Sequence, residues 1–147
     1  MACPLFIPTL PLSEIVAIAP PLGALFDGVC AAEPSAGIEP DILRRYCNYG
    51  YARGQCIRAG QTTADAVRFA VRGQDADTVE VAWAVESNHH PVAVGRISVN
   101  ANCEAAPGNL LAGQVRACAS AYLRQSACSV TEATAITARR TAGGVHP

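Results

Sequence analysis

Lysine is absent from this 147-residue chain, in which all 11 basic residues are arginine. The formal net charge is only −1 at pH 7, so the chain has no overall positive field that would attract nucleic acid or an anionic membrane. It also lacks any uninterrupted apolar run of about 18 residues, which argues against a transmembrane helix. The length suits a single domain.

Large aromatic side chains are scarce, although half of the residues are hydrophobic. The chain has three Phe, four Tyr and one Trp, and much of its apolar content is alanine. A core so poor in large side chains is often supported by a metal, a disulfide or a partner chain.

The N-terminus lacks the features of a signal peptide. No positive charge precedes its apolar part, prolines interrupt it at five positions before residue 22, and no small-residue cleavage pattern precedes Cys30. We therefore expect a cytoplasmic location, where thiols stay reduced or bind metal. The seven cysteines are also an odd number, which cannot form a closed set of intramolecular disulfides.

The middle of the chain predicts a three-stranded antiparallel meander. Apolar residues alternate with polar ones in 65–72 and 78–86, and this period of two is typical of strands with one buried face. A third strand is expected over 92–99, directly after Pro91. We expect a turn over 73–77 and a β-bulge at Gly95.

Two helices are expected after the meander. Residues 109–125 carry apolar side chains at helical spacing, so this segment, capped by Asn109, would cover the sheet. A last short helix would begin at Ser129, and 141–147 would form a loose tail. The fold class is therefore α+β, with one small domain over 1–128 followed by this C-terminal extension.

The first third, residues 1–60, is rich in Pro and Gly and is expected to be mostly irregular. Within it we expect one short helix near 13–18, with Ser13 as its N-cap. A second helix would begin at Pro40 and end at about Cys47, and Gly50 would stop it.

Four of the seven cysteines lie in this irregular third, where no apolar stripe explains them: Cys3, Cys30, Cys47 and Cys56. Four thiols in a loop-rich segment suit one four-thiolate metal site, whose ligand bonds replace a missing apolar core. By contrast, Cys118 lies on the apolar stripe of the predicted long helix and is expected to be a core residue. For Cys103 and Cys128 we expect no function.

The spacing of the four cysteines bears on the metal. Structural zinc sites usually contain two cysteines separated by two to four residues, and no such pair is present here. The same spacing argues against a ferredoxin-type binding run. A [4Fe-4S] cluster is larger than one ion and can take ligands from distant loops, and Cys3 is followed by Pro4, a frequent companion of cluster ligands. We favour the cluster, with zinc and a metal-free protein as open alternatives.

Arginines surround the last two of these cysteines. Either a [4Fe-4S] cluster or a zinc ion bound by four thiolates carries a formal charge of about −2. Positive side chains and backbone N–H groups nearby would stabilise it, and near a cluster they would raise the reduction potential. The residues expected in this role are Arg44, Arg45, Arg53 and Arg58, together with the backbone of Gly50 and Gly54.

Three stretches also resemble a family of small uncharacterised bacterial four-cysteine proteins: C-N-Y-G-Y-A-R-G-Q-C at 47–56, D-A-V-R-F-A-V at 65–71 and H-H-P-V-A-V-G at 89–95. Members share an early Cys-Pro, a P-P-L-G stretch before a cysteine, the C-N-x-G-Y-A-R-G-x-C core, a hairpin and a closing helix. The resemblance covers most of the chain up to about residue 125. It implies no activity, but it does imply that the four cysteines act together.

Other residues allow further interpretations. Tyr46, Tyr49 and Tyr51 beside the arginines are typical of a surface on which nucleic-acid bases stack, or they pack around the metal loop. His89 and His90 form either a metal or acid–base site or, as we favour, a solvated turn. Cys47 and Cys56 are too far apart in sequence for the usual catalytic thiol pair.

These observations predict a non-enzymatic iron–sulfur protein, either an electron-transfer subunit or an accessory subunit of a larger complex that its cluster stabilises. The first alternative is a module with a structural zinc ion that docks on protein or nucleic acid. The second is a metal-free assembly subunit that uses an exposed strand edge as its contact.

Overall fold

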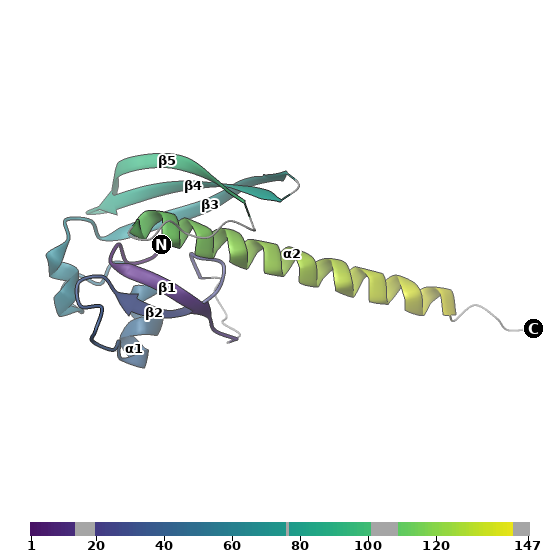
Figure 1. Cartoon of the computed structure of the whole chain (residues 1–147), viewed down its shortest axis with the longest axis horizontal. Coiled ribbons are helices and arrows are strands. Elements are labelled where there is room, and N and C mark those ends of the chain that lie inside the picture. Colours follow the sequence, from purple (N-terminus) through teal and green to yellow (C-terminus); the bar gives the residue numbers. More distant parts are fainter. Residues whose placement is uncertain (14–19, 76, 101–108, 143–147) are drawn as a thin grey trace, which may run out of the picture.

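The computed structural model describes residues 1–13, 20–75, 77–100 and 109–142, with side chains up to residue 126. Two antiparallel sheets lie on opposite sides of one long helix, so the predicted α+β class is confirmed (Figure 1). The elements in chain order are β1 (Phe6–Pro11), β2 (Phe26–Cys30), α1 (Pro40–Ile42), the π-helix η1 (Leu43–Cys47), the 3₁₀-helix η2 (Ile57–Gln61), β3 (Ala66–Asp75), β4 (Thr78–Ser87), β5 (His90–Asn100) and α2 (Leu110–Ala142).

The predicted meander is the sheet β3-β4-β5, with all neighbours antiparallel. Two details differ from expectation. β3 continues to Asp75 through the predicted turn, because an irregularity in register between Val71 and Gly73 absorbs the extra residue. The irregularity in β4–β5 lies between Val85 and Glu86, so the prediction of a bulge at Gly95 is wrong.

Gly95 serves a different purpose, which is to make room for an indole ring. It is paired with Trp83 of β4. A Cβ at position 95 would lie 2.5 Å from Cζ2 of Trp83. The absent side chain therefore lets the largest aromatic residue of the chain pack flat against β5.

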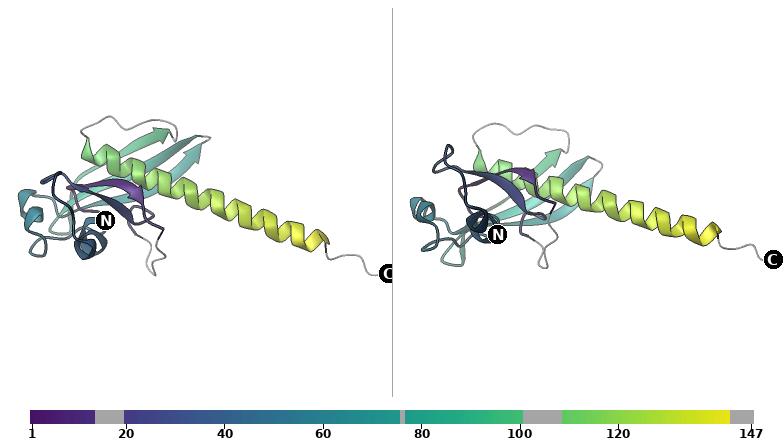
Figure 2. Two further views of the ribbon diagram at one scale, coloured as in Figure 1. Left: turned by 60° about the horizontal axis from the view of Figure 1, so that its bottom comes forward. Right: turned by 90° about the horizontal axis from the view of Figure 1, so that it is seen from below.

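Helix α2 covers the apolar face of the meander, as predicted. Asn109 caps it, since its Oδ1 accepts a hydrogen bond of 3.1 Å from the N–H of Ala112. Val115, Cys118 and Ala119 are buried on the helix, so Cys118 is a core residue as expected. Figure 2 shows the same helix also lying against β1.

The C-terminal part of α2 departs from the prediction. A separate helix was expected to begin at Ser129, but α2 continues unbroken through this residue to Ala142. The alanines of this segment favour continued helix over a break. Within the described part of the chain, no helix is both long and apolar enough to cross a membrane.

A second sheet, β1–β2, occupies part of the first third, where irregular structure was expected. Its register pairs Phe6 with Cys30 and Pro8 with Gly28. Proline is tolerated because a two-stranded sheet has only edge strands. The short helix expected near 13–18 falls almost entirely on 14–19, outside the described residues, whereas the helix expected from Pro40 is present as α1 followed by η1.

Candidate metal centre

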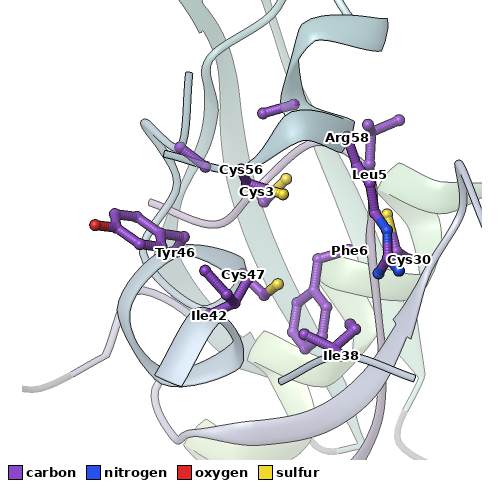
Figure 3. Close-up of a pocket in the computed structure, with 12 residues that line it drawn as sticks. Cys3, Leu5, Phe6, Cys30, Ile38, Ile42, Tyr46, Cys47, Cys56 and Arg58 are labelled. Atoms are coloured by element: carbon purple, nitrogen blue, oxygen red, sulfur yellow. The ribbon is translucent and has the colours of Figure 1, made fainter. Parts of the chain in front are cut away.

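The side chains of all four predicted ligands, Cys3, Cys30, Cys47 and Cys56, line one cavity. Figure 3 shows their sulfur atoms around a common space, with Phe6 on one side and Arg58 beside Cys30. The empty space measures about 350 Å³, including the part that opens to solvent. Three of the cysteines are buried and Cys56 is half-buried. Three parts of the chain that are distant in sequence therefore contribute thiols, and the loop from Cys47 to Cys56 contributes two of them.

These thiols are not arranged around a single point. Among the described residues, no three Cys, His, Asp or Glu side chains are placed to hold one metal ion. A tetrahedral zinc site with Zn–S bonds of about 2.3 Å requires sulfur atoms about 3.8 Å apart. Binding of one zinc ion would therefore require the cysteine side chains to move together.

Cys3 is positioned by a turn and by a buried glutamine. The N–H of Phe6 donates to the carbonyl of Cys3 over 3.1 Å, and Pro4 favours this turn because its φ is preset. Burial raises the pKa of the Cys3 thiol, while backbone N–H groups of Leu5 and Phe6 that bond to its sulfur act in the opposite direction. Gln114 of α2, fully buried, donates from Nε2 to the carbonyls of both Cys3 and Phe6 over 2.7 Å.

Cys47 and Cys30 are connected through a buried asparagine. Cys47 ends η1, and the next residue, Asn48, has no exposed surface. Its Nδ2 donates to the carbonyls of Phe26 and Leu43 over 3.0 Å, and its Oδ1 accepts from the N–H of Phe26 over 2.9 Å. Because Phe26 begins the strand that ends at Cys30, this side chain fixes η1 against β2.

A main-chain hydrogen bond joins Cys3 and Cys47. The N–H of Cys3 donates to the carbonyl of Cys47 over 2.9 Å. Burial, and then the neighbouring Cys3, Cys56 and Cys30, raise the pKa of the Cys47 thiol to about 12, while Arg58 acts in the opposite direction. Without a metal the Cys47 thiol is therefore protonated at neutral pH, and metal binding there would release its proton.

The loop from Cys47 to Cys56 turns at two glycines in the left-handed region, Gly50 (φ +74°) and Gly54 (φ +80°). A Cβ at Gly50 would lie 2.8 Å from Cβ of Ala66 and 3.1 Å from the carbonyl oxygen of Ala2. A Cβ at Gly54 would meet nothing within 4 Å. Gly50 therefore allows close packing of this loop on the N-terminal segment that carries Cys3.

Gly50→Ala is expected to destabilise the protein by about 2–4 kcal/mol, through left-handed strain together with crowding against Ala66. Gly54→Ala, the matched control, should cost only about 1 kcal/mol, since it adds strain without a contact. Urea denaturation of both variants measures the difference. Equal losses at the two positions would contradict the role assigned to Gly50.

Of the four arginines expected near the metal, one lines the cavity and the other three do not. Arg58 lines it and is held in place by Glu33 (Nε to Oε2, 2.7 Å) and by the carbonyl of Gly37 (3.3 and 3.4 Å). Arg53 instead pairs with Asp65 over 2.8 Å and donates to the carbonyl of Thr63 over 3.0 Å, which attaches its loop to the start of β3. Arg53 therefore does not line the cavity, and the role expected for it beside the metal stays a prediction. The side chains of Arg44 and Arg45 are exposed and lie outside the cavity lining.

Two of the three tyrosines have packing roles. Tyr46 lines the cavity, and its hydroxyl donates to Oε1 of Gln55 over 3.4 Å. The ring of Tyr51 stacks on the ring of His89, with centroids 4.4 Å apart and an angle of 16° between the planes. Its hydroxyl donates to Oε2 of Glu86. Tyr51 thus attaches the cysteine loop to the β4–β5 hairpin.

Glu86 connects this arrangement to the sheet. It is buried, and its carboxylate accepts from Nε of Arg68 over 2.8 Å as well as from Tyr51. These two hydrogen bonds, that of Arg68 first, hold the pKa of Glu86 below its usual 4.5. The carboxylate therefore adds stability above about pH 4.5, and this stability is lost as the pH falls through the lowered pKa of the folded state.

Glu86→Gln is expected to lower the free energy of unfolding by about 1–2 kcal/mol at neutral pH, because two charge-assisted hydrogen bonds become neutral. The difference from wild type should shrink as the pH falls below about 4.5, where the native carboxylate takes up its proton. Urea denaturation across this pH range measures it. A difference that does not change with pH would show that the charge of Glu86 contributes nothing.

Comparison with known proteins identifies no relative: no family model, no curated protein and no solved structure matches the chain. The resemblance to the bacterial four-cysteine family therefore stays a prediction.

Proposed function

We propose that the chain binds a [4Fe-4S] cluster through Cys3, Cys30, Cys47 and Cys56 and acts in the cytoplasm as a non-enzymatic iron–sulfur protein. The observation that supports this proposal is the convergence of four thiols, from three separate parts of the chain, on one cavity. Such a cluster would supply one-electron redox chemistry.

The surroundings of the thiols suit an anionic cluster. The cavity is otherwise lined mainly by apolar residues, which keep water away from the sulfur atoms: Leu5, Phe6, Ile38, Ile42, Ala52 and Ala59. Among the described residues, Arg58 is the one charged side chain in this lining. It would offset part of the formal charge of about −2, as would the N–H groups that face Cys3.

Zinc remains the alternative, and with it a module that docks on protein or nucleic acid. Four thiols are a suitable ligand set for zinc, but the cysteines do not meet the spacing that one ion requires. A cluster distributes its four ligands over separate iron atoms, so its thiolates stand farther apart.

The uneven exposure of the four cysteines favours electron transfer over a purely structural role. Cys56 is the only half-buried member of the four, and the next residue, Ile57, is 93 % exposed. A redox partner that docks on η2 would therefore approach the cluster through Cys56. Burial of the other three thiols would protect the cluster from water.

Anaerobic purification of the full chain, followed by visible spectroscopy before and after addition of dithionite, tests the proposal. We expect a brown protein whose broad absorbance is bleached by dithionite. A colourless protein with one equivalent of zinc would support the zinc module instead. A folded protein without metal would support the metal-free assembly subunit.

A further inference from the structure

Strand β5 forms one edge of the meander. Within the described part of the chain it pairs with β4 alone, and Figure 1 shows it at the boundary of the sheet. Its register with β4 is regular from Val85↔Ala93 to Thr78↔Asn100. A regular edge strand presents a row of backbone N–H and C=O groups that another strand can pair with.

The opposite edge of the same sheet is closed at one end and irregular at the other. Ala2 forms a bridge with Val67 of β3, through hydrogen bonds of 2.7 and 2.8 Å. Farther along, the register shift between Val71 and Gly73 distorts the strand. These are devices by which proteins prevent association through strand edges. On β5 the corresponding features, a proline at position 91 and the shift opposite Glu86, occur only at its beginning.

The first half of β5 carries two exposed apolar side chains and no exposed acid or arginine. Val92 and Val94 are 61 % and 69 % exposed, and they are two of the four large hydrophobic residues exposed in the described part of the chain. Val94 and Arg96 lie two positions apart in the regular part of the strand and so share one face of the sheet, whereas Val92 is the extra residue at the register shift. Arg96 is the only charged side chain within β5 other than its histidine at position 90.

We propose that β5 pairs antiparallel with β5 of a second copy of this chain, about a two-fold axis near Val94 and Gly95. Three strands from each copy would then form one continuous sheet. An axis at Val94 places the two Val94 side chains opposite each other and Val92 opposite Arg96 of the other copy. An axis at Gly95 places Val94 opposite Arg96 of the other copy.

The pattern of charge in β5 suits such pairing with itself. With the axis at Gly95 each arginine faces a valine of the other copy, and its aliphatic stem covers apolar surface while the guanidinium keeps its ion pair with Glu80 of its own copy. Two arginines face each other only if the axis lies at Arg96, so repulsion between them excludes that register. The same short patch thus serves both copies, which is the property required of a two-fold interface.

Light scattering coupled to gel filtration tests this proposal on the full chain as isolated, at about 100 µM, well above a micromolar Kd. We expect wild type to elute as a dimer and Val94→Lys as a folded monomer, since lysine on an edge opposes pairing. Leu10→Lys is the matched control, because Leu10 is 66 % exposed and lies on β1; it should stay dimeric.

Hydrogen exchange identifies the surface independently of any variant. Amides of β5 should exchange more slowly at about 100 µM than after dilution below the Kd, whereas those of β1 should not change. A monomeric wild type, or a dimer that persists in Val94→Lys, would overturn the proposal. Pairing of β5 with a different protein predicts the first of these results. None of these results depends on which metal the cysteines bind.

Discussion

Cys47→Ser is expected to lose the bound cluster and to loosen the first third of the chain, whereas the meander keeps its structure. Cys47 is buried at the centre of the proposed site, and a main-chain hydrogen bond joins it to Cys3. A serine hydroxyl binds iron much more weakly than a thiolate, so three ligands would remain at a site built for four. Because ligand bonds contribute to folding, loss of the metal should also lower the free energy of unfolding of residues 1–60.

The matched control is Cys118→Ser, which changes another buried thiol in the same way. Cys118 lies on α2 and does not line the cavity, so this variant should keep wild-type iron content and lose only about 1–3 kcal/mol of stability. Iron analysis and hydrogen exchange on the two purified variants make the comparison. Equal iron content in Cys47→Ser and wild type would refute the ligand assignment.

Asn48→Ala is expected to have the largest effect on stability of any change outside the cysteines. The side chain makes three hydrogen bonds to buried backbone, two with Phe26 and one with Leu43. Each buried group that is left unsatisfied costs about 1–3 kcal/mol, and the carbonyl of Leu43 keeps a second donor. We therefore expect a loss of about 3–4 kcal/mol, a large part of the stability of a small domain.

Asn109→Ala provides the comparison for this loss. Asn109 is exposed and caps α2 with a single hydrogen bond, so its removal should cost about 1 kcal/mol. Urea denaturation of both variants, with iron analysis of each, measures stability and metal content together. Asn48→Ala should also retain less iron, because Asn48 holds Cys47 next to the strand that ends at Cys30. If Asn48→Ala lost no more stability than Asn109→Ala, the role assigned to Asn48 would be contradicted.

The meander and its covering helix could be predicted because their signals are local. Val79 and Val81 alternate with polar neighbours and prove to be buried. The cap at Asn109 could likewise be read from one residue and its sequence context. Such patterns reflect the geometry of single elements, so no knowledge of distant contacts is needed.

The sheet β1–β2 could not be predicted for the opposite reason. Pro8 and Gly28, which face each other in its register, are both unfavourable in isolated strands. What stabilises these strands is packing of Phe6 and Phe26 in the core that they share with α2, which a single sequence does not display.

At the site, the four thiols could be grouped from the sequence because nothing else explained them, but their supports could not. Asn48 has no local signal, since its partner Phe26 lies 22 residues away. Gln114 has a weak local signal, because it is polar yet lies beside Val115 and one turn before Cys118 on the apolar stripe of α2. The ion pair of Arg53 with Asp65 could not be predicted either, because closeness in sequence to Cys56 does not determine where the guanidinium points.

The most direct test of the central claim is the stoichiometry of iron, sulfide and zinc in the full chain, purified without exposure to oxygen. A [4Fe-4S] cluster bound by the four cysteines would give about four iron and four sulfide per chain and no zinc. Stoichiometric zinc without sulfide, or a folded chain that contains neither metal, would contradict it.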